Sequence, residues 1–233
     1  MIDPPPRYNP GVMARVGSRF SPGILEVLDT VQDRSDEWHQ RSITSLHGSD
    51  PLWVALGDST AQGIGASSID NGYVGQLRQR LADEDRPHDI VNLARTGARI
   101  DDVLQRQLLV LNSLPRQPAL VTCAVGSNDV MRVDSAFWVT RRMRSLLARL
   151  GRSDAQVVIA TVPQGRNSIF ARRLNDLIRT EAPRHGLAVA DVARSLRGPW
   201  ADKLANDRFH PNDDGYADWT TAFVSPLGLD PTT

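Results

Sequence analysis

The stretch LWVALGDST at residues 52–60 decides the fold, because it joins a fully apolar run to a polar turn. The apolar run from Leu52 to Leu56 has the length of a β-strand and does not alternate with polar residues. Such a strand is buried on both faces, which is typical of a parallel sheet covered by helices. Four more runs of strand length follow along the chain: Ile90–Leu93, Leu120–Val125, Val157–Val162 and Leu187–Val192.

Amphipathic stretches of helical length lie between these runs. Strands that alternate with helices predict a three-layer α/β domain, which we place at residues 51–228. Residues 229–233 are predicted to be a short tail. A chain of 233 residues is long enough to bury the core of such a domain without a metal or disulfide staple.

Residues 1–50 are predicted to form an N-terminal extension of this domain. Four prolines within residues 1–20 indicate an irregular lead-in. Ser21-Pro22 is typical of a helix N-cap followed by proline in the first turn. The apolar spacing that follows predicts a helix from about 22 to 46. The sequence leaves open whether this extension packs on the domain, covers its crevice or mediates dimerisation.

The charge composition argues against a nucleic-acid partner. The chain has 27 basic and 27 acidic side chains, for a formal net charge of zero. A chain without net charge has no field that attracts nucleic acid or an anionic membrane. No segment approaches the roughly 18 consecutive apolar residues of a membrane-spanning helix, so no integral membrane segment is predicted. The N-terminus lacks the pattern of a signal peptide, and we therefore expect a cytoplasmic protein.

Residue types that hold metals and cofactors are scarce. Cys123 is the only cysteine, so neither an intrachain disulfide nor a cysteine-rich zinc site can form. Lys203 is the only lysine, and it does not belong to a phosphate-binding G-x-x-x-x-G-K-[ST] loop. The five histidines form neither an H-E-x-x-H motif nor a close pair. We predict no metal site and no cofactor.

Chemically active residue types follow the predicted strands. In a doubly wound sheet, ligands bind at the carboxyl ends of the strands. Ser59 follows the first strand, and a serine hydroxyl is an effective nucleophile only with a base within hydrogen-bond reach. His210 is the histidine in a motif-like setting, and Asp207, three residues earlier, can reach its imidazole Nδ1. Ser59, His210 and Asp207 are therefore the candidate catalytic nucleophile, base and orienting carboxylate.

An acyl-transfer site also needs donors for the oxyanion that forms in the reaction. Three groups at the predicted strand ends could supply them. They are the backbone N–H groups of Ser59 and Gly97 and the side-chain amide of Asn128. Each residue alone is more typical of an ordinary turn, because glycine and asparagine tolerate positive φ. Their occurrence in order, at the strand ends of one sheet, favours an oxyanion hole.

Four blocks of the sequence resemble those of the SGNH hydrolases, also called GDSL esterases and lipases. Each block carries one candidate residue: VALGDSTAQGIGA at 54–66 with Ser59, NLARTG at 92–97 with Gly97, AVGSNDV at 124–130 with Asn128, and DRFHPND at 207–213 with His210. The last block is similar to the family's Asp-x-x-His. The resemblance covers residues 52–217 and departs from the family at Thr60, where the family has the leucine of its name.

The resemblance implies a flavodoxin-like fold with a parallel five-stranded sheet of order 2-1-3-4-5. It implies a catalytic triad of Ser59, His210 and Asp207, and an oxyanion hole formed by Ser59, Gly97 and Asn128. It further implies a serine esterase that hydrolyses a small-molecule carboxylic ester through an acyl-enzyme on Ser59. A short or medium acyl chain or an acetylated sugar would suit such a site. An acyltransferase or a thioesterase of the same fold is the alternative.

Two other function classes fit the residues less well. A nucleotide-binding module would use Gly63-x-Gly65, but Ser68 stands where the third glycine of G-x-G-x-x-G belongs. A non-catalytic binding module would not need Ser59, Asn128 and His210 together. The sequence leaves the oligomeric state open.

Overall fold

The computed structural model describes residue 7 and residues 22–131, 136–163, 168–196 and 199–231. The predicted lead-in at residues 1–20, apart from Arg7, lies outside these ranges. The predicted N-cap Ser21 and the last two residues of the predicted tail lie outside them too.

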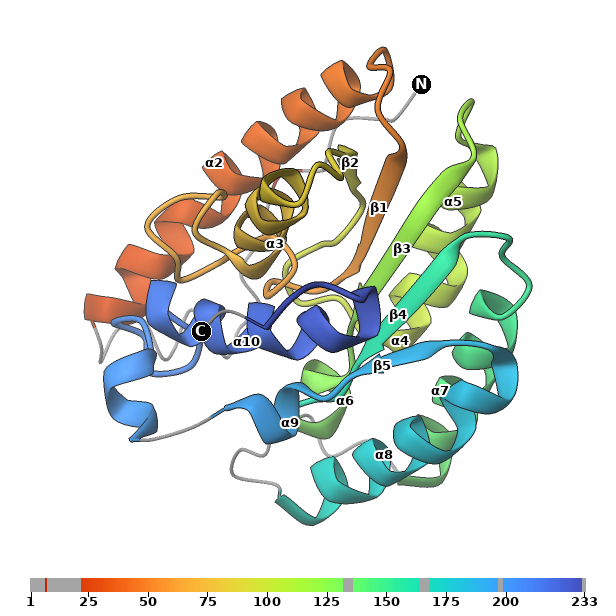
Figure 1. The fold of residues 1–233 in the computed structure, drawn as a ribbon. Coiled ribbons are helices and arrows are strands. Elements are labelled where there is room, and N and C mark those ends of the chain that lie inside the picture. Colours follow the sequence, from red (N-terminus) through yellow and green to blue (C-terminus); the bar gives the residue numbers. More distant parts are fainter. Residues whose placement is uncertain (1–6, 8–21, 132–135, 164–167, 197–198, 232–233) are drawn as a thin grey trace.

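In the described part of the chain, five parallel strands form one sheet in the order β2-β1-β3-β4-β5 (Figure 1). The strands are β1 Leu52–Gly57, β2 Asp89–Asn92, β3 Pro118–Ala124, β4 Gln156–Ala160 and β5 Ala188–Ala190. The predicted parallel sheet and its strand order are confirmed. The observed β5 is shorter than the apolar run that predicted it.

Strand β1 shows why its residues must be apolar throughout. Leu52, Val54 and Leu56 contribute to the core on one face of the sheet, whereas Trp53 and Ala55 contribute to the core on the other. Successive side chains of a strand point to opposite faces, so a strand covered on both faces needs apolar residues at every position. All six residues of β1 are buried.

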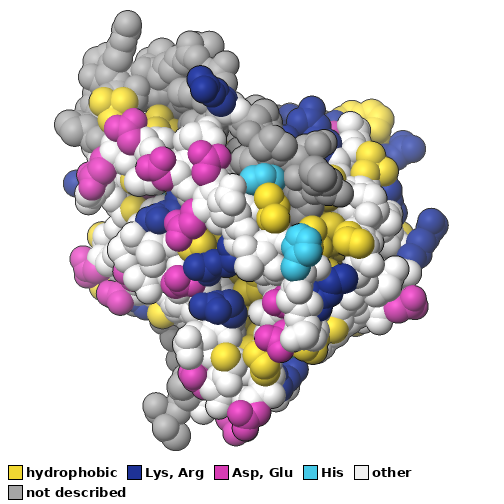
Figure 2. All heavy atoms as spheres, turned by 90° about the horizontal axis from the view of Figure 1, so that it is seen from above, with side chains coloured by type: hydrophobic (Ala, Val, Ile, Leu, Met, Phe, Trp, Pro, Cys, Tyr) yellow, Lys and Arg dark blue, Asp and Glu magenta, His cyan; other side chains and the backbone are white. Residues whose placement is uncertain are grey.

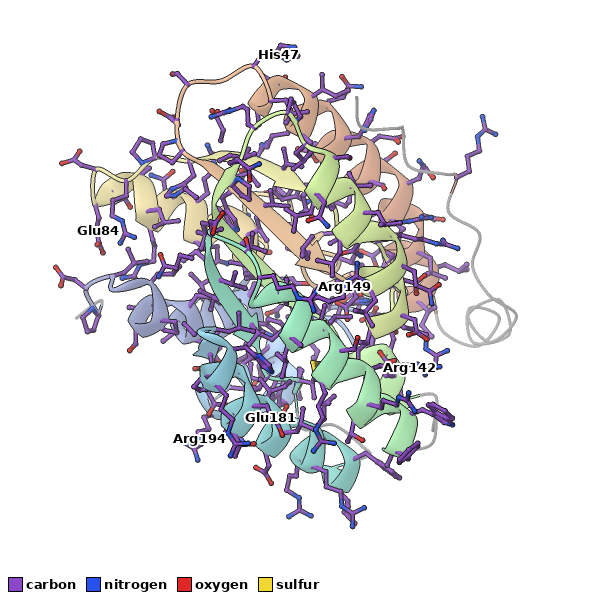
Figure 3. All side chains as sticks on the ribbon, turned by 90° about the vertical axis from the view of Figure 1, so that its right-hand side faces the viewer. His47, Glu84, Arg142, Arg149, Glu181 and Arg194 are labelled. Atoms are coloured by element: carbon purple, nitrogen blue, oxygen red, sulfur yellow. The ribbon has the colours of Figure 1, made fainter. Side chains whose placement is uncertain are left out.

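Helices cover both faces of the sheet. One face packs against α3 Tyr73–Asp83, α9 Val192–Ser195 and α10 Asp213–Val224. The other face packs against α4 Ile100–Asp102, a π-helical turn Val103–Gln107, α5 Leu108–Ser113, α7 Ala136–Leu150 and α8 Ser168–Glu181. Figure 3 shows the layers from the side, with Arg142 and Arg149 on α7 on one side and Glu84, which follows α3, on the other.

The first described helix, α2 Pro22–Ser45, lies along the edge strand β2 (Figure 1). The Ser45 and Ser42 hydroxyls accept the N–H groups of Ile90 and Asn92, at 3.1 and 3.0 Å. An edge strand offers unpaired backbone groups that must be covered or bonded. The two hydroxyls therefore satisfy the outer side of β2.

The surface mixes charges of both signs. On the face seen from above, acidic and basic side chains are interspersed with small apolar areas (Figure 2). This distribution agrees with the formal net charge of zero. Among the helices of the described residues, none has the length and hydropathy needed to cross a membrane.

Candidate active site

The loop that follows β1, here the serine loop (residues 58–67), presents Ser59 at the carboxyl end of the sheet. Strand β1 ends at Gly57, whose φ is +141°. A Cβ at Gly57 would collide with the carbonyl oxygen of Ala124, so a glycine is required there. The Asp58 Oδ1 accepts hydrogen bonds from the Thr60 N–H (3.0 Å) and the Thr60 hydroxyl (2.8 Å). These two bonds close the turn around Ser59.

The loop that carries His210, here the histidine loop (residues 204–212), is closed by its own backbone. Leu204 and Pro211 form an isolated antiparallel bridge, and the Ala205 N–H donates to the His210 carbonyl oxygen at 2.8 Å. The Asp207 Oδ1 accepts the N–H groups of Phe209 and His210, both at 2.9 Å. An aspartate that bonds the backbone two and three residues ahead fixes a turn. The sequence spacing Asp-x-x-His therefore sets the local geometry.

The structure brings the three candidate catalytic residues into one line of hydrogen bonds. The His210 Nε2 lies 2.9 Å from the Ser59 Oγ, although the two residues are 151 positions apart. The His210 Nδ1 lies 2.5 Å from the Asp207 Oδ2. Ser59 is 5% exposed, and the side chains of His210 and Asp207 are 12% and 7% exposed. The three side chains thus form a connected, mostly buried group.

The Asp207 carboxylate is held in its charged form. Burial opposes that charge, but the bonds and charge of the His210 ring and the two backbone N–H groups outweigh it. Together they lower the pKa of Asp207 below its ordinary value. A carboxylate that stays charged beside Nδ1 can orient the imidazole and stabilise its protonated form.

Two of the candidate oxyanion donors, Gly97 and Asn128, lie outside the serine and histidine loops. Gly97 has a φ of +78° in a turn closed by the Ala98 N–H, which donates to the Arg95 carbonyl oxygen at 2.9 Å. Asn128 lies in helix α6 Ser127–Met131 and lines the cleft that also contains Ser59. Its Nδ2 donates to the Ala98 carbonyl oxygen at 3.0 Å, which ties α6 to the turn.

Each of the three candidate donors keeps an N–H group without an acceptor among the described residues. Within the described residues, neither the Ser59 N–H nor the Gly97 N–H meets an acceptor. The Asn128 amide uses one of its N–H bonds for Ala98 and keeps a second. Gly97 itself is not among the described residues that line the cleft. The structure therefore places Asn128 in the same cleft as Ser59, and Gly97 next to the residue that Asn128 binds.

Asp129 fixes the position of Asn128 from the buried side. Its Oδ2 accepts the Ile100 N–H at 3.1 Å, and its Oδ1 lies 3.9 Å from the Arg99 Nε. Burial raises the pKa of Asp129 to about 6, although the Ile100 N–H and the Arg99 charge partly offset this effect. Asp129 and Asn128 thus hold α6 against the turn that contains Gly97.

Asp58 is a second carboxylate at the cleft with a different environment. Burial raises its pKa, and the two bonds from Thr60 and the nearby His210 partly offset that rise. Its hydrogen bonds within the described residues go to Thr60 and not to His210. Asp58 therefore shapes the serine loop, whereas Asp207 holds the imidazole.

The cleft around Ser59 has a volume of about 980 Å³ and a largely apolar lining. Its apolar lining residues include Val130, Met131, Pro163, Trp200 and Phe209. The Phe209 ring meets the His210 ring edge to face, with 4.7 Å between the ring centres. A cleft that combines apolar lining residues with the Ser59, His210 and Asp207 side chains suits a ligand that has both apolar and polar parts.

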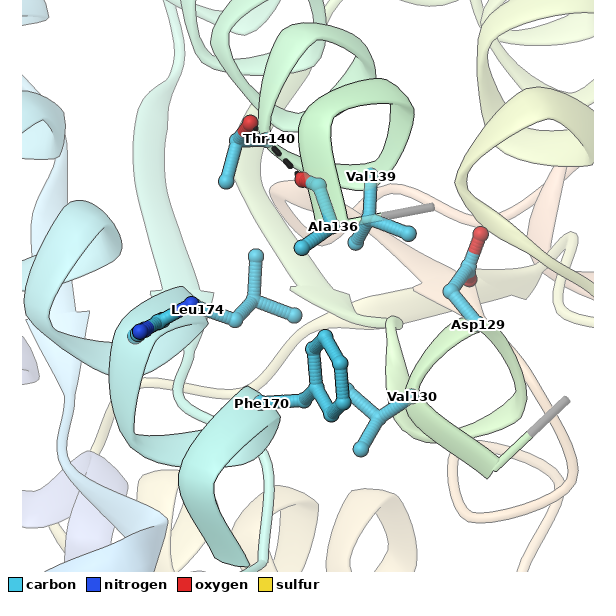
Figure 4. Close-up of a pocket in the computed structure, with 8 residues that line it drawn as sticks. Asp129, Val130, Ala136, Val139, Thr140, Phe170 and Leu174 are labelled. Atoms are coloured by element: carbon cyan, nitrogen blue, oxygen red, sulfur yellow. Dashed lines mark hydrogen bonds between the residues drawn. The ribbon is translucent and has the colours of Figure 1, made fainter. Parts of the chain in front are cut away.

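A smaller pocket adjoins the cleft between α6, α7 and α8 (Figure 4). Val130 lines both, and the Val139, Phe170 and Leu174 side chains converge on the small pocket. Its volume is about 20 Å³, which is room for about one water molecule. Val130 therefore contributes both to the cleft and to the small pocket between α6, α7 and α8.

Sequence reasoning missed two buried amides that support the strand ends. The Gln107 amide accepts from the Gly57 N–H and donates to the Gly57 carbonyl oxygen, both at 2.8 Å. Asn175 makes the same pair of 2.8 Å bonds with the backbone of Val162 after β4. Each amide replaces a neighbouring strand where the sheet ends. In the sequence, each of these two amides is a polar residue on an otherwise apolar helix face, and this is the pattern that could have identified them.

Within the described residues, no group of three or more His, Cys, Asp or Glu side chains is arranged to hold a metal ion. The arrangement of hydroxyl, imidazole and carboxylate is the one used for nucleophilic acyl transfer.

Comparison with solved structures agrees with this fold. The first similar structure is LAE5, described as an α/β hydrolase enzyme from the metagenome of Lake Arreo, Spain. It is 23% identical, with a TM-score of 0.66, and the match covers 80% of this chain and 100% of that chain. Axe2, an acetylxylan esterase from Geobacillus stearothermophilus, is 18% identical, with a TM-score of 0.64 and coverage of 78% and 96%.

A third similar structure is TesA, which is 21% identical, with a TM-score of 0.65 and coverage of 76% of this chain and 97% of that chain. At such identities the likeness shows the fold. Comparison with curated proteins gives no match. The family model described as GDSL-like Lipase/Acylhydrolase family matches residues 55–217, from β1 through the histidine loop. The chain therefore belongs to the GDSL-like lipase/acylhydrolase family.

Proposed function

We propose that this protein is a serine esterase that hydrolyses carboxylic esters through an acyl-enzyme on Ser59. The observation that carries the proposal is the line of contacts from Asp207 through His210 to Ser59, with separations of 2.5 and 2.9 Å. Hydrogen-bonded contact of nucleophile with base, and of base with orienting group, is the geometric signature of such a site.

The reaction would begin with attack of the Ser59 Oγ on the ester carbonyl carbon. The His210 Nε2 takes the serine proton, and the charged Asp207 stabilises the imidazolium that forms. The N–H groups of Ser59 and Gly97 and the Asn128 amide donate to the oxyanion. Collapse of this intermediate expels the alcohol, which receives the proton from His210. Water then attacks the acyl-enzyme with His210 as base, which releases the acid and restores Ser59.

The cleft supports a small-molecule ester with a short or medium acyl chain or an acetylated sugar. Its volume of about 980 Å³ exceeds what an acetyl group needs, and its wall of Met131, Trp200 and Phe209 can cover an alkyl chain or a sugar ring. The similar structures include an acetylxylan esterase, and the activity of that protein falls within this class. An acyltransferase or thioesterase would use the same acyl-enzyme with another acceptor or leaving group.

A Ser59→Ala variant tests the proposal. We expect at least a thousandfold loss of turnover of p-nitrophenyl acetate and butyrate, with unchanged thermal unfolding, since alanine removes only a hydroxyl. A fluorophosphonate should label the wild type at Ser59, as read by peptide mass spectrometry. Ser127→Ala, the matched control at the next serine in the cleft, should keep most of the turnover. Unchanged turnover in the Ser59 variant would refute the assignment.

A further inference from the structure

Helix α2 packs directly against the two loops that carry Ser59 and His210. Its residues Val27 and Val31, which are 7% and 2% exposed, form a small core with Ile64 and Ala205. Ile64 belongs to the serine loop and Ala205 to the histidine loop. We call these four residues the α2 cluster. The cluster joins three segments that are far apart in the sequence.

Each loop member of the α2 cluster is one hydrogen bond away from a catalytic candidate. The Ile64 N–H donates to the Ser59 carbonyl oxygen at 3.0 Å, and the Ala205 N–H donates to the His210 carbonyl oxygen at 2.8 Å. A displacement of the cluster would therefore move the backbone of Ser59 or His210. Apolar packing and short backbone bonds transmit such displacements, because protein interiors are close-packed.

Polar contacts at two more positions tie α2 to the same loops. The Arg34 Nη2 donates to the carbonyl oxygens of Ala66 and Ser67 in the serine loop, at 3.2 and 2.7 Å. The Asn206 Nδ2 of the histidine loop donates to the Glu26 Oε2 at 2.7 Å. Glu26 and Arg34 are two turns apart on α2. One rigid helix thus contacts both loops at different points along its length.

The same helix also reaches the turn that contains Gly97. The Trp38 Nε1 donates to the Gln62 carbonyl oxygen at 3.0 Å, and Trp38 is buried. The Gln62 side-chain amide contacts the Ser35 Oγ at 3.4 Å and accepts the Thr96 hydroxyl at 2.7 Å. Thr96 immediately precedes Gly97. Gln62 therefore connects α2 to a proposed oxyanion donor.

The contact between the two loops leaves little freedom in their spacing. A Cβ at Gly65 would lie 2.7 Å from the His210 Cβ and 2.5 Å from the Pro211 carbonyl oxygen, and the φ of Gly65 is +96°. The serine loop thus touches the histidine loop directly beside the imidazole. The elements that pack against both loops therefore determine whether the His210 Nε2 reaches the Ser59 Oγ.

We propose that α2 is a positioning element of the active site, which holds the serine and histidine loops at the separation where His210 meets Ser59. The family match begins at residue 55, so α2 lies outside the part of the chain that it covers. The proposal rests on the proposed esterase function. Misplacement of a catalytic group by about 1 Å can cost up to about a hundredfold in rate, so loss of this support should lower turnover.

The test is the double variant Val27→Ala/Val31→Ala, which shrinks the α2 cluster without touching Ser59, His210 or the cleft. We expect kcat for p-nitrophenyl butyrate to fall about tenfold with KM within about twofold, because the change affects positioning and not substrate contacts. The rate of fluorophosphonate labelling at Ser59 should fall by a similar factor. Ser45→Ala is the matched control on the same helix, because Ser45 bonds β2 and neither loop. It should lower the thermal unfolding temperature with kcat unchanged.

Hydrogen exchange of the Ile64 and Ala205 amides, followed by NMR, gives a readout that does not depend on activity. Both amides should exchange faster in the double variant and at the wild-type rate in Ser45→Ala. Wild-type kcat in a double variant that is destabilised as much as the control would overturn the proposal, as would unchanged exchange at both amides. Absence of turnover and labelling in the wild type would instead refute the esterase assignment, and the exchange data would still decide whether α2 holds the two loops.

Discussion

The strands of the sheet begin at one edge, here the amino edge, and end at the other, here the carboxyl edge. The two edges differ in backbone conformation and in the charges that they bury. Of the seven glycines with positive φ in the described residues, five lie at the carboxyl end of β1 or in the loops that follow β1, β2 and β3, namely Gly57, Gly63, Gly65, Gly97 and Gly126. The same carboxyl edge buries three aspartates with shifted pKa values, Asp58, Asp129 and Asp207. Unusual backbone and buried charge therefore gather where Ser59 and His210 meet.

At the amino edge, one arginine makes an ion pair and two hydrogen bonds to backbone carbonyl oxygens. Arg116, which precedes β3, donates to the Ser45 carbonyl oxygen at 2.7 Å, to the Asp50 carbonyl oxygen, and to the Asp89 Oδ2 at 2.9 Å. Its side chain is 24% exposed. One arginine thus joins α2, the segment before β1, and β2. Arg116 at the amino edge therefore contributes to stability, whereas the backbone at the carboxyl edge is less regular and carries the candidate reactive groups.

The sharpest test at the carboxyl edge is Asn128→Ala. We expect kcat to fall about 100- to 1,000-fold with KM little changed, because an oxyanion donor strengthens its bond in the transition state. Steady-state kinetics on p-nitrophenyl butyrate would measure both constants. An effect confined to KM would mean that Asn128 binds substrate in the ground state, and the proposed oxyanion role would be wrong.

Asp129→Asn tests the energetic cost of burying charge at this edge. The pKa of Asp129 is raised from 3.8 to about 6, so the folded protein binds the carboxyl proton more tightly than the unfolded chain does. The stability that this proton contributes is fully present below about pH 4 and is lost as the pH rises to about 6. Asparagine does not titrate, so the variant lacks this pH dependence. The free energy of unfolding of the variant, relative to wild type, should therefore rise between pH 4 and 6 by up to about 3 kcal/mol. Urea titrations across this range measure it, and a difference that does not change with pH would contradict the prediction.

The smallest expected effect on activity belongs to the amino edge. Arg116→Ala should lower the free energy of unfolding by about 1–3 kcal/mol, because it leaves two half-buried carbonyl oxygens and a carboxylate without their donor. We expect kcat and KM to stay within about twofold of wild type. Chemical denaturation and steady-state kinetics would separate the two quantities. A large fall in kcat would show that the two edges are coupled and that the amino edge does not act on stability alone.

Much of the fold could be predicted from local pattern. The apolar run from Leu52 to Leu56 identified a strand buried on both faces, and β1 is buried along its whole length. One of the predicted amphipathic stretches, with Val103 and Leu111 on its apolar face, is not a single regular helix. It forms α4, a π-helical turn and α5, and the buried Gln107 in the π-helical turn bonds the end of β1. The periodicity of apolar residues shows which residues face the core. It does not show where a side-chain amide takes the place of a neighbouring strand in bonding the backbone.

The candidate site could be located by residue type and order, because parallel strands bring their carboxyl ends to one edge. The Asp-x-x-His spacing even specified a local turn, since Asp207 bonds the N–H groups of Phe209 and His210. The Ser59 to His210 distance could not be predicted. It depends on how two loops that are far apart in the sequence pack against each other, and no local sequence pattern specifies that packing.

The sequence by itself therefore determined the strands, the order of the reactive residues and the family to which the chain belongs. Only the tertiary structure decided what the described part of the extension, helix α2, packs against. Its apolar spacing predicted a helix, but the same spacing fits a helix that packs on the domain, covers the crevice or joins two chains. Packing of Val27 and Val31 against Ile64 and Ala205 shows that α2 packs on the domain. The physical reason is that an amphipathic helix specifies that it must bury one face, whereas its partner is set by which surfaces the rest of the fold leaves uncovered.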